Sequence, residues 1–250
     1  MKQIITLALA VILMTGIAKA QEFKISKSSG RLEINIGKVT VEGYNGNEII
    51  FTSKDRENKD DERAKGLKEI NGLGLDDNTG LGINVEDKGA TVVVRQLKKM
   101  NSSEIKIMVP KGVAISYAFE SQYGGDVSFR NVEGEIEVSA NYNSVELINV
   151  SGPVTAKSIY GHIEASFDQN VKGPISIISV YGYADVTLPG TVKANLKLNT
   201  SYGELFMSPD FKMEVDRGED DENRVTGKIN GGGMNIGITC NYGKVYVRKK

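Results

Sequence analysis

The sequence predicts an all-β protein folded as a short-coil β-solenoid, or β-helix, with coils of about 20 residues and an N-terminal β-hairpin region. A tyrosine recurs every 18 to 21 residues from Tyr123 to Tyr202, and a further Tyr-Gly pair follows 40 residues later. A weaker turn signal falls between the tyrosines, as at Val132-Glu133-Gly134 and Val150-Ser151-Gly152. The 250 residues include 28 glycines but only 5 prolines, which indicates many turns. The repeated tyrosines are Tyr123, Tyr142, Tyr160, Tyr181, Tyr202 and Tyr242.

Residues 1–20 have the features of a signal peptide. Lys2 supplies the positive start, an apolar run spans 4–17, and Ala18-Lys19-Ala20 matches an A-x-A cleavage site. We expect cleavage after Ala20, and export of residues 21–250 as a single domain to the periplasm, the outer surface or the medium. No later apolar stretch reaches the ~20 residues that a membrane span needs, so the mature chain is expected to have no transmembrane segment.

The N-terminal part of the mature chain predicts paired strands. Leu32, Ile34 and Ile36 alternate with polar residues, and so do the residues around Val41. A turn containing Asn45-Gly46 then leads into a second apolar run, 49–51, which is the pattern of a β-hairpin. Further strands are expected at 83–85, 91–95 and 105–109, the last ending at Pro110 because proline cannot donate to a sheet ladder.

Two charged segments interrupt the strands, at about 53–80 and 208–228, and we expect both to be loops. The chain then closes with the strand after Tyr242 and ends in Lys249-Lys250. Charged residues suit the exposed edge of a solenoid, so this strand is expected to cap the stack.

Aligning the repeats on the tyrosines shows what each coil contributes. A small residue precedes each tyrosine by two positions, and apolar pairs such as Val145 and Leu147 follow it. The pair after Tyr123 comes one place later, which we interpret as a one-residue bulge. The small residues share the parity of the apolar positions, which favours tyrosines that face the interior, although an outward aromatic strip that stacks on sugars is the alternative. The small residues are Ser121, Ala140, Ser158, Ser179, Thr200 and Cys240.

Cys240, the only cysteine, occupies the small-residue position, so we expect a buried filler. A single cysteine forms no internal disulfide and builds no cysteine-rich metal site.

Several segments together resemble a known family. They are the hairpin around Val39–Ile49, the stretch Asp77-Asn78-Thr79-Gly80, the Val109-Pro110-Lys111-Gly112 step, the Asn230-Gly231-Gly232-Gly233 turn and the closing strand 241–248. With the signal peptide, they are similar to the bacterial putative-adhesin family, secreted domains of unknown function common in Bacteroidota. The resemblance covers nearly the whole mature chain and implies an adhesin-head-like β-solenoid at the envelope or surface, without established catalysis. The chain departs from the family at the repeat corner, where it has Tyr-Gly and members of the family often have Ser-Gly or Asn-Gly.

The chemical motifs of common enzymes are missing. His162 is the single histidine, in a position expected to face solvent, and no G-x-S-x-G, H-E-x-x-H, P-loop or C-x-x-C sequence occurs. The outward positions four after three successive tyrosines carry Glu146, Glu164 and Asp185, a carboxylate ladder with no interleaved lysine or arginine. Such a ladder suits a solvated face, a weak cation or ligand surface, or a carbohydrate-active enzyme that works with paired carboxylates. Tyr183 and Tyr246 lie on the same outward face.

We therefore expect a non-enzymatic, adhesin-like module that binds a glycan or an envelope or surface protein through Glu146, Glu164, Asp185, Tyr183 and Tyr246. The alternatives are a carbohydrate-active lyase or hydrolase that uses the carboxylate ladder, and a purely structural envelope protein. No cofactor or metal is expected. The net charge of −1 offers no attraction for nucleic acid.

Overall fold

The computed structural model describes residues 21–53, 62–64, 66–67, 70–100, 102–216 and 222–250. The predicted signal peptide, most of the charged run 54–65 and residues 217–221 lie outside the described residues. Among the described residues there are 21 strands and one 3-10 turn, η1 (Glu62–Ala64), which confirms the all-β prediction.

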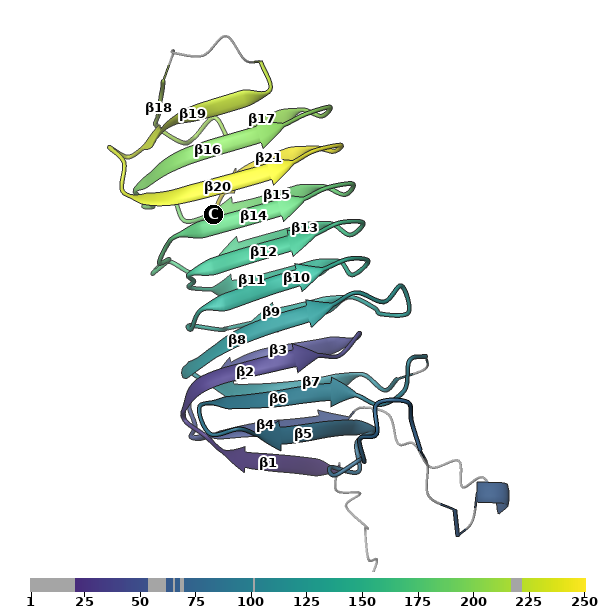
Figure 1. Cartoon of the computed structure of the whole chain (residues 1–250). Helices are drawn as coiled ribbons and strands as arrows, with labels where there is room; N and C mark the ends of the chain where they lie inside the picture. The colour runs from purple at the N-terminus through teal and green to yellow at the C-terminus, as the bar shows by residue number, and fades with distance from the viewer. Residues whose placement is uncertain (1–20, 54–61, 65, 68–69, 101, 217–221) are drawn as a thin grey trace, which may run out of the picture.

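The strands form two sheets that face each other along one stack (Figure 1). In spatial order the ten-stranded sheet contains β1 (Glu22–Ser26), β4 (Glu48–Ser53), β7 (Ile105–Pro110), β3 (Val39–Tyr44), β9 (Val127–Arg130), β11 (Val145–Val150), β13 (Ile163–Phe167), β15 (Ala184–Leu188), β21 (Val245–Lys249) and β17 (Leu205–Met207). The eleven-stranded sheet contains β18 (Met213–Val215), β19 (Arg224–Ile229), β16 (Ala194–Thr200), β20 (Met234–Cys240), β14 (Ile175–Ser179), β12 (Val154–Ser158), β10 (Ile136–Ala140), β8 (Gly112–Phe119), β2 (Ser29–Asn35), β6 (Thr91–Gln96) and β5 (Ile83–Asp87).

Each coil of the solenoid contributes one strand to each sheet. The chain runs along β10, turns at a tyrosine corner, returns along β11 and turns again into β12. Successive coils pair in parallel and in register, so that Val138 meets Ala156 in one sheet and Leu147 meets Ala165 in the other. The alternate residues of every coil are buried between the sheets, as the apolar spacing predicts.

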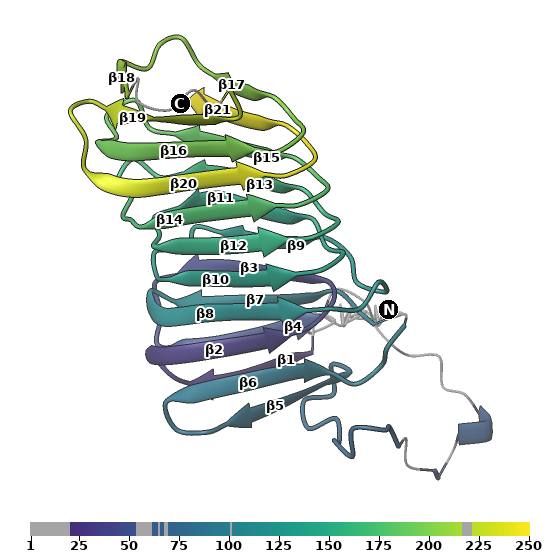
Figure 2. The same ribbon diagram turned by 45° about the horizontal axis from the view of Figure 1, so that its top comes forward.

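The last coil along the chain is not the last coil of the stack. Strands β20 and β21 lie between the coil β14–β15 and the coil β16–β17, as Figure 2 shows for β20. The chain therefore leaves one position open after β15, builds β16 and β17 beyond it, and returns to fill that position. The prediction that the final strand caps the stack is wrong, because β21 pairs with β15 on one side and β17 on the other.

The N-terminal end repeats this arrangement. The coil β2–β3 lies between β8–β9 and β6–β7, although β2 and β3 come first in the sequence. The predicted hairpin of β3 and β4 is therefore wrong: both strands form, but β7 lies between them and pairs with β3 in parallel and with β4 antiparallel. The sequence pattern of two alternating runs and a turn gives no sign of β7, which lies about 60 residues further along the chain.

Antiparallel strands close the stack. At the N-terminal end β5 pairs with β6, and β4 and β1 follow β7. At the C-terminal end β19 and β18 extend the eleven-stranded sheet beyond β16. The second predicted loop, 208–228, is thus wrong in part, because it contains β18 and most of β19.

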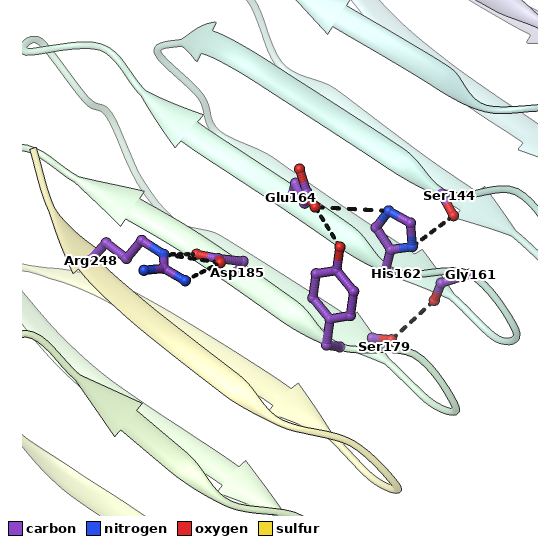
Figure 3. A network of polar contacts seen from close by, with 8 residues as sticks. Ser144, Gly161, His162, Glu164, Ser179, Asp185 and Arg248 are labelled. Atoms are coloured by element: carbon purple, nitrogen blue, oxygen red, sulfur yellow. Dashed lines mark hydrogen bonds and ion pairs between the residues drawn. The ribbon is translucent and has the colours of Figure 1, made fainter.

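The tyrosine corners determine how one coil sits on the next. In three coils the small residue donates a hydrogen bond to the carbonyl of the residue that follows the tyrosine of the neighbouring coil. These bonds run from Ser158 Oγ to the Asn143 carbonyl (2.8 Å), from Ser179 Oγ to Gly161 (3.1 Å, Figure 3) and from Cys240 Sγ to Gly182 (3.1 Å). These side chains are buried, so an unpaired corner carbonyl would be costly. The prediction that Cys240 is a buried small residue is confirmed.

The corner glycine is required by the same close approach. A Cβ added to Gly182 would lie 2.4 Å from the Gly161 carbonyl oxygen, and a Cβ on Gly161 would lie 2.1 Å from the Asn143 oxygen. The Tyr142 corner has Asn143 in place of the glycine. The neighbouring Tyr123 corner contains an additional residue at Gly124-Gly125, and the Asn143 side chain lies beside this longer loop and donates to the Gly37 carbonyl (2.7 Å). The additional residue therefore lies in the corner, and the predicted bulge is wrong, since β9 and β11 pair without a register shift.

The tyrosine rings themselves face solvent, so the prediction of an interior stack is wrong. Tyr160 is 55% exposed, and the other repeated tyrosines are between 45% and 76% exposed. The parity argument fails because β12 ends at Ser158, and residues 159–162 form the corner, where side chains no longer alternate.

Outside the core, the tyrosines stack on one another. The order is Tyr142, Tyr160, Tyr181, Tyr242 and Tyr202, with ring centroids 4.9 to 5.2 Å apart and nearly parallel planes. The spacing follows the strand separation of about 4.8 Å. Tyr123, beyond the longer first corner, has Lys99 Nζ 5.7 Å from its ring centroid.

We predict that Gly182→Ala lowers the free energy of unfolding by about 1–3 kcal/mol, because its methyl group forces two corners apart. Thermal and urea unfolding followed by circular dichroism measure the change. Gly237→Ala is the matched control, since a Cβ at Gly237 in β20 would meet nothing within 4 Å. Equal melting temperatures for the two variants would contradict the corner constraint.

We further predict that Tyr160→Ala costs about 1–2 kcal/mol, because it removes two exposed stacking contacts and creates no cavity. Phe167→Ala is the comparison: Phe167 is fully buried, and its loss is expected to cost about 3–5 kcal/mol. The same unfolding measurements compare the two variants. A loss at Tyr160 as large as that at Phe167 would show that the ring supports the core after all.

Candidate functional site

The outer face of the ten-stranded sheet carries the carboxylate ladder that the spacing predicts. Glu146 on β11 lies in register with Glu164 on β13, which lies in register with Asp185 on β15. The next two positions of this row are aromatic, Tyr246 on β21 and Phe206 on β17. The row thus changes from acidic to aromatic along the stack.

Arginines flank the ladder, which corrects the prediction that it lacks basic residues. Arg130 Nη2 lies 2.8 Å from Glu146, which also accepts a hydrogen bond from Ser128 Oγ (2.9 Å). Arg248 binds Asp185 with two nitrogens, each 2.7 Å from a carboxylate oxygen (Figure 3). The sequence pattern misses both pairs because Arg130 and Arg248 belong to neighbouring coils, 16 and 63 residues from their partners.

Glu164, at the middle of the ladder, lies beside Tyr183 and His162. The Tyr183 hydroxyl donates to Glu164, and His162 Nε2 lies 3.9 Å from the same carboxylate. The hydrogen bond to Glu164, with smaller contributions from burial and nearby charges, raises the pKa of Tyr183 to about 12. The phenol therefore remains a neutral donor throughout the physiological pH range.

Aromatic side chains form a continuous group beside the carboxylates. The His162 ring stacks on Tyr183 (centroids 4.6 Å apart), Tyr183 meets Tyr246 edge-on, and Tyr246 stacks on Phe206 (5.3 Å). Phe206 is absent from the predicted set. Its alternation with Leu205 and Met207 could have identified it as outward-facing, and it is 43% exposed.

A shallow depression of about 280 Å³ runs along the ladder. Its walls include Glu146, Glu164, Asp185 and Arg248, with Ser166 and Thr187 in the next outward row. The five residues predicted as a ligand surface thus lie on one face of four neighbouring strands.

Ser144, His162 and Glu164 are connected in the order of a hydrolytic triad, with Ser144 Oγ 3.0 Å from His162 Nδ1. The gap of 3.9 Å between His162 and Glu164 exceeds a hydrogen bond. The His162 and Glu164 side chains are 39% and 51% exposed, so the arrangement lies in water rather than in an enclosed, preorganised site. In the part of the chain that the structure describes, no group of three His, Cys, Asp or Glu residues is placed to hold a metal ion.

Comparison with known proteins identifies the fold. The family model named Toastrack DUF4097 matches residues 125–248, and this part of the chain is similar to that family of unknown function. A search of curated proteins finds no match. These findings confirm the resemblance and the β-solenoid prediction.

Two solved structures are similar to the chain. A putative cell adhesion protein from Clostridium sporogenes is 16% identical, with a TM-score of 0.50, and the match covers 93% of this chain and all of the other. A putative adhesin from Bacteroides fragilis is 11% identical, with a TM-score of 0.37, and the match covers 93% of this chain and 98% of the other. Among the helices that the structure describes, none has the length and apolarity to span a membrane.

We predict that Glu164→Gln lowers the titration midpoint of Tyr183 from about 12 toward the ordinary tyrosine value. The carboxylate stabilises the neutral phenol by accepting its proton and opposes the phenolate by repulsion, so its removal makes ionisation easier. The midpoint is measured by NMR from the ring carbon attached to the hydroxyl. Glu146→Gln is the control and should leave the midpoint unchanged; a Glu164→Gln midpoint equal to that of the wild type would contradict the contact.

Proposed function

We propose that this chain is an exported, non-enzymatic, adhesin-like module that binds a glycan or a surface protein of the cell envelope. The observation that carries the proposal is the surface formed by Tyr183, Tyr246 and Phe206 beside Glu164 and Asp185. This surface lies on a flat, rigid sheet and is accessible to a macromolecule.

The chemistry of this surface favours a carbohydrate. Sugar rings present C–H faces that pack on aromatic rings, and hydroxyl groups that donate to carboxylates. Phe206 and Tyr246 supply the first kind of contact, and Glu164 supplies the second. A surface protein is the second class of partner, because protein surfaces also carry aromatic and charged groups that this face could bind.

The export signal predicted at residues 1–20 supports a location outside the cytoplasm. The Clostridium sporogenes structure, named as a putative cell adhesion protein, supports an adhesin-like role by analogy of fold. This analogy supports a surface location and gives no ligand.

The geometry supports an enzyme less well. A carbohydrate-active enzyme needs one carboxylic acid to donate a proton and a second carboxylate to act as nucleophile or base. Glu146 and Asp185 are each bound by an arginine, and the ladder lies on an open face. A purely structural role is the remaining alternative, and it requires no exposed aromatic group on the sheet.

A glycan array probed with the labelled chain from residue 21 tests the proposal. Binding to at least one glycan class is expected, with loss of about tenfold or more in Tyr246→Ala, because that variant removes the ring between Tyr183 and Phe206. Thr155→Ala, on the outer face of the other sheet, is the control and should bind as the wild type does. If the chain binds no glycan on the array and no protein in envelope extracts, the proposal is wrong and the purely structural alternative is favoured.

A further inference from the structure

A second concave site lies at the opposite corner of the solenoid, where the chain passes from the ten-stranded to the eleven-stranded sheet (left edge in Figure 1). The corners of three neighbouring coils stack there. Their backbones are joined by hydrogen bonds from Ser151 N to the Val132 carbonyl (3.0 Å) and from Lys172 N to the Ser151 carbonyl (2.7 Å). This pairing holds the three corners in a fixed relation, so their side chains form one preorganised surface.

These corners enclose a pocket of about 390 Å³, lined entirely by polar side chains. The volume lies in the lower part of the range of ligand-binding pockets. Asn131, Asn149 and Asn170 contribute amides, Asp168 a carboxylate and Lys172 an ammonium group.

Two asparagines adopt a conformation that glycine would adopt without strain. Asn131 and Asn149 have φ angles of 53° and 54°, and Asn149 Nδ2 donates to Asn131 Oδ1 (2.9 Å). Asn230 also has a positive φ, but its amide donates to the Gly190 and Val192 carbonyls and supports the backbone. Among the described residues, the Asn149 amide donates to the Asn131 side chain, which also lines the pocket, and not to the backbone. The corner therefore holds side-chain amides that its backbone does not need.

Ser151 contributes a hydroxyl group to the pocket. The residue as a whole is only 6% exposed, and it lines the pocket. Its Oγ is not among the described buried side-chain oxygens that lack a hydrogen-bond partner, so the oxygen is accessible from the pocket. A ligand hydroxyl or a water can therefore bind it there.

The donor set indicates the class of ligand. Asparagine, serine and lysine donate, and asparagine, aspartate and glutamate accept, so the pocket suits a molecule whose groups do both. The charges of the pocket nearly balance. Glu133 is paired with Lys111, and the remaining charged residues, Asp168 and Lys172, have opposite signs. A divalent cation is disfavoured, because the Lys172 ammonium group lines the same pocket and Glu133 is paired with Lys111. In the described residues, no group of three His, Cys, Asp or Glu side chains is placed to hold a metal ion. Sugar hydroxyls both donate and accept, and a pyranose ring is of suitable size.

We propose that this corner pocket is a binding site for a neutral pyranose, separate from the aromatic face of the ten-stranded sheet. Vicinal hydroxyls of the sugar bind the amides of Asn131 and Asn149 and the carboxylate of Asp168. No aromatic ring stacks on the sugar here, so hydrogen bonds alone set the affinity, and the Kd for a single ring is on the order of 1–10 mM.

NMR titration of the isotope-labelled chain from residue 21 tests this site directly. The probes are the methyl pyranosides of glucose, galactose, mannose, N-acetylglucosamine and fucose, each added to about 50 mM. We expect at least one of them to shift the side-chain amide signals of Asn131, Asn149 or Asn170 in a saturable manner. If no pyranoside does so, the proposal is wrong.

Asn149→Gly is the decisive variant, because glycine keeps the positive φ while the amide is removed. It should retain the wild-type melting temperature to within a few degrees and lose saturable binding over the same concentration range. Asn149→Gly that binds as the wild type does would overturn the proposal. Tyr246→Ala should leave the corner titration unchanged, so failure of the aromatic face as an adhesive surface is distinguishable from failure of the corner site.

Discussion

The hydrogen bond between a small buried side chain and the corner carbonyl of the neighbouring coil is the contact on which this structure depends. It fixes the offset between coils at the corners that have a donor, because Ser158, Ser179 and Cys240 each reach the carbonyl directly beside them. The close approach leaves no room for a Cβ at Gly161 or Gly182, and so explains the recurring glycine. Strand register, core layers and the outward rows of side chains all follow from that offset.

Because the coils stack in register, residues at the same position of successive coils together form a surface. One carboxylate per coil becomes a ladder, and one tyrosine per coil becomes a stack whose rings lie about 5 Å apart. Most ring faces in the tyrosine stack are covered by neighbouring rings, so they are poorly placed to bind a ligand. The aromatic group on the flat sheet differs in its neighbours, because Tyr246 and Phe206 continue the row of Glu146, Glu164 and Asp185. This sheet face therefore combines aromatic and carboxylate groups, which the tyrosine stack does not.

At both ends of the solenoid, one coil lies between two coils that are consecutive in the sequence. The coil β20–β21 lies between β15 and β17 in the ten-stranded sheet, and β2–β3 separates β6–β7 from β8–β9. This arrangement ties the outermost coils to the middle of the stack. Antiparallel strands end the eleven-stranded sheet on both sides and the ten-stranded sheet at β1, whereas β17 remains a short parallel edge. Local patterns did not predict these features, because the pairing partners are far apart in sequence and an alternating strand specifies its face but not its neighbour.

The sequence by itself determined the coil: its length of about 20 residues, its buried apolar positions, the small residue filled by Cys240, and the parity that puts Glu146, Glu164 and Asp185 on one outward face. These properties are local, since they follow from side-chain alternation and turn chemistry within a single repeat. Only the tertiary structure decided that the tyrosines face solvent, that Arg130 and Arg248 neutralise the ladder, and that asparagines of successive corners share a pocket. Each of these features depends on which two coils are neighbours in the stack. The free energy that determines the neighbours comes from packing between coils, and a single strand does not contain that information.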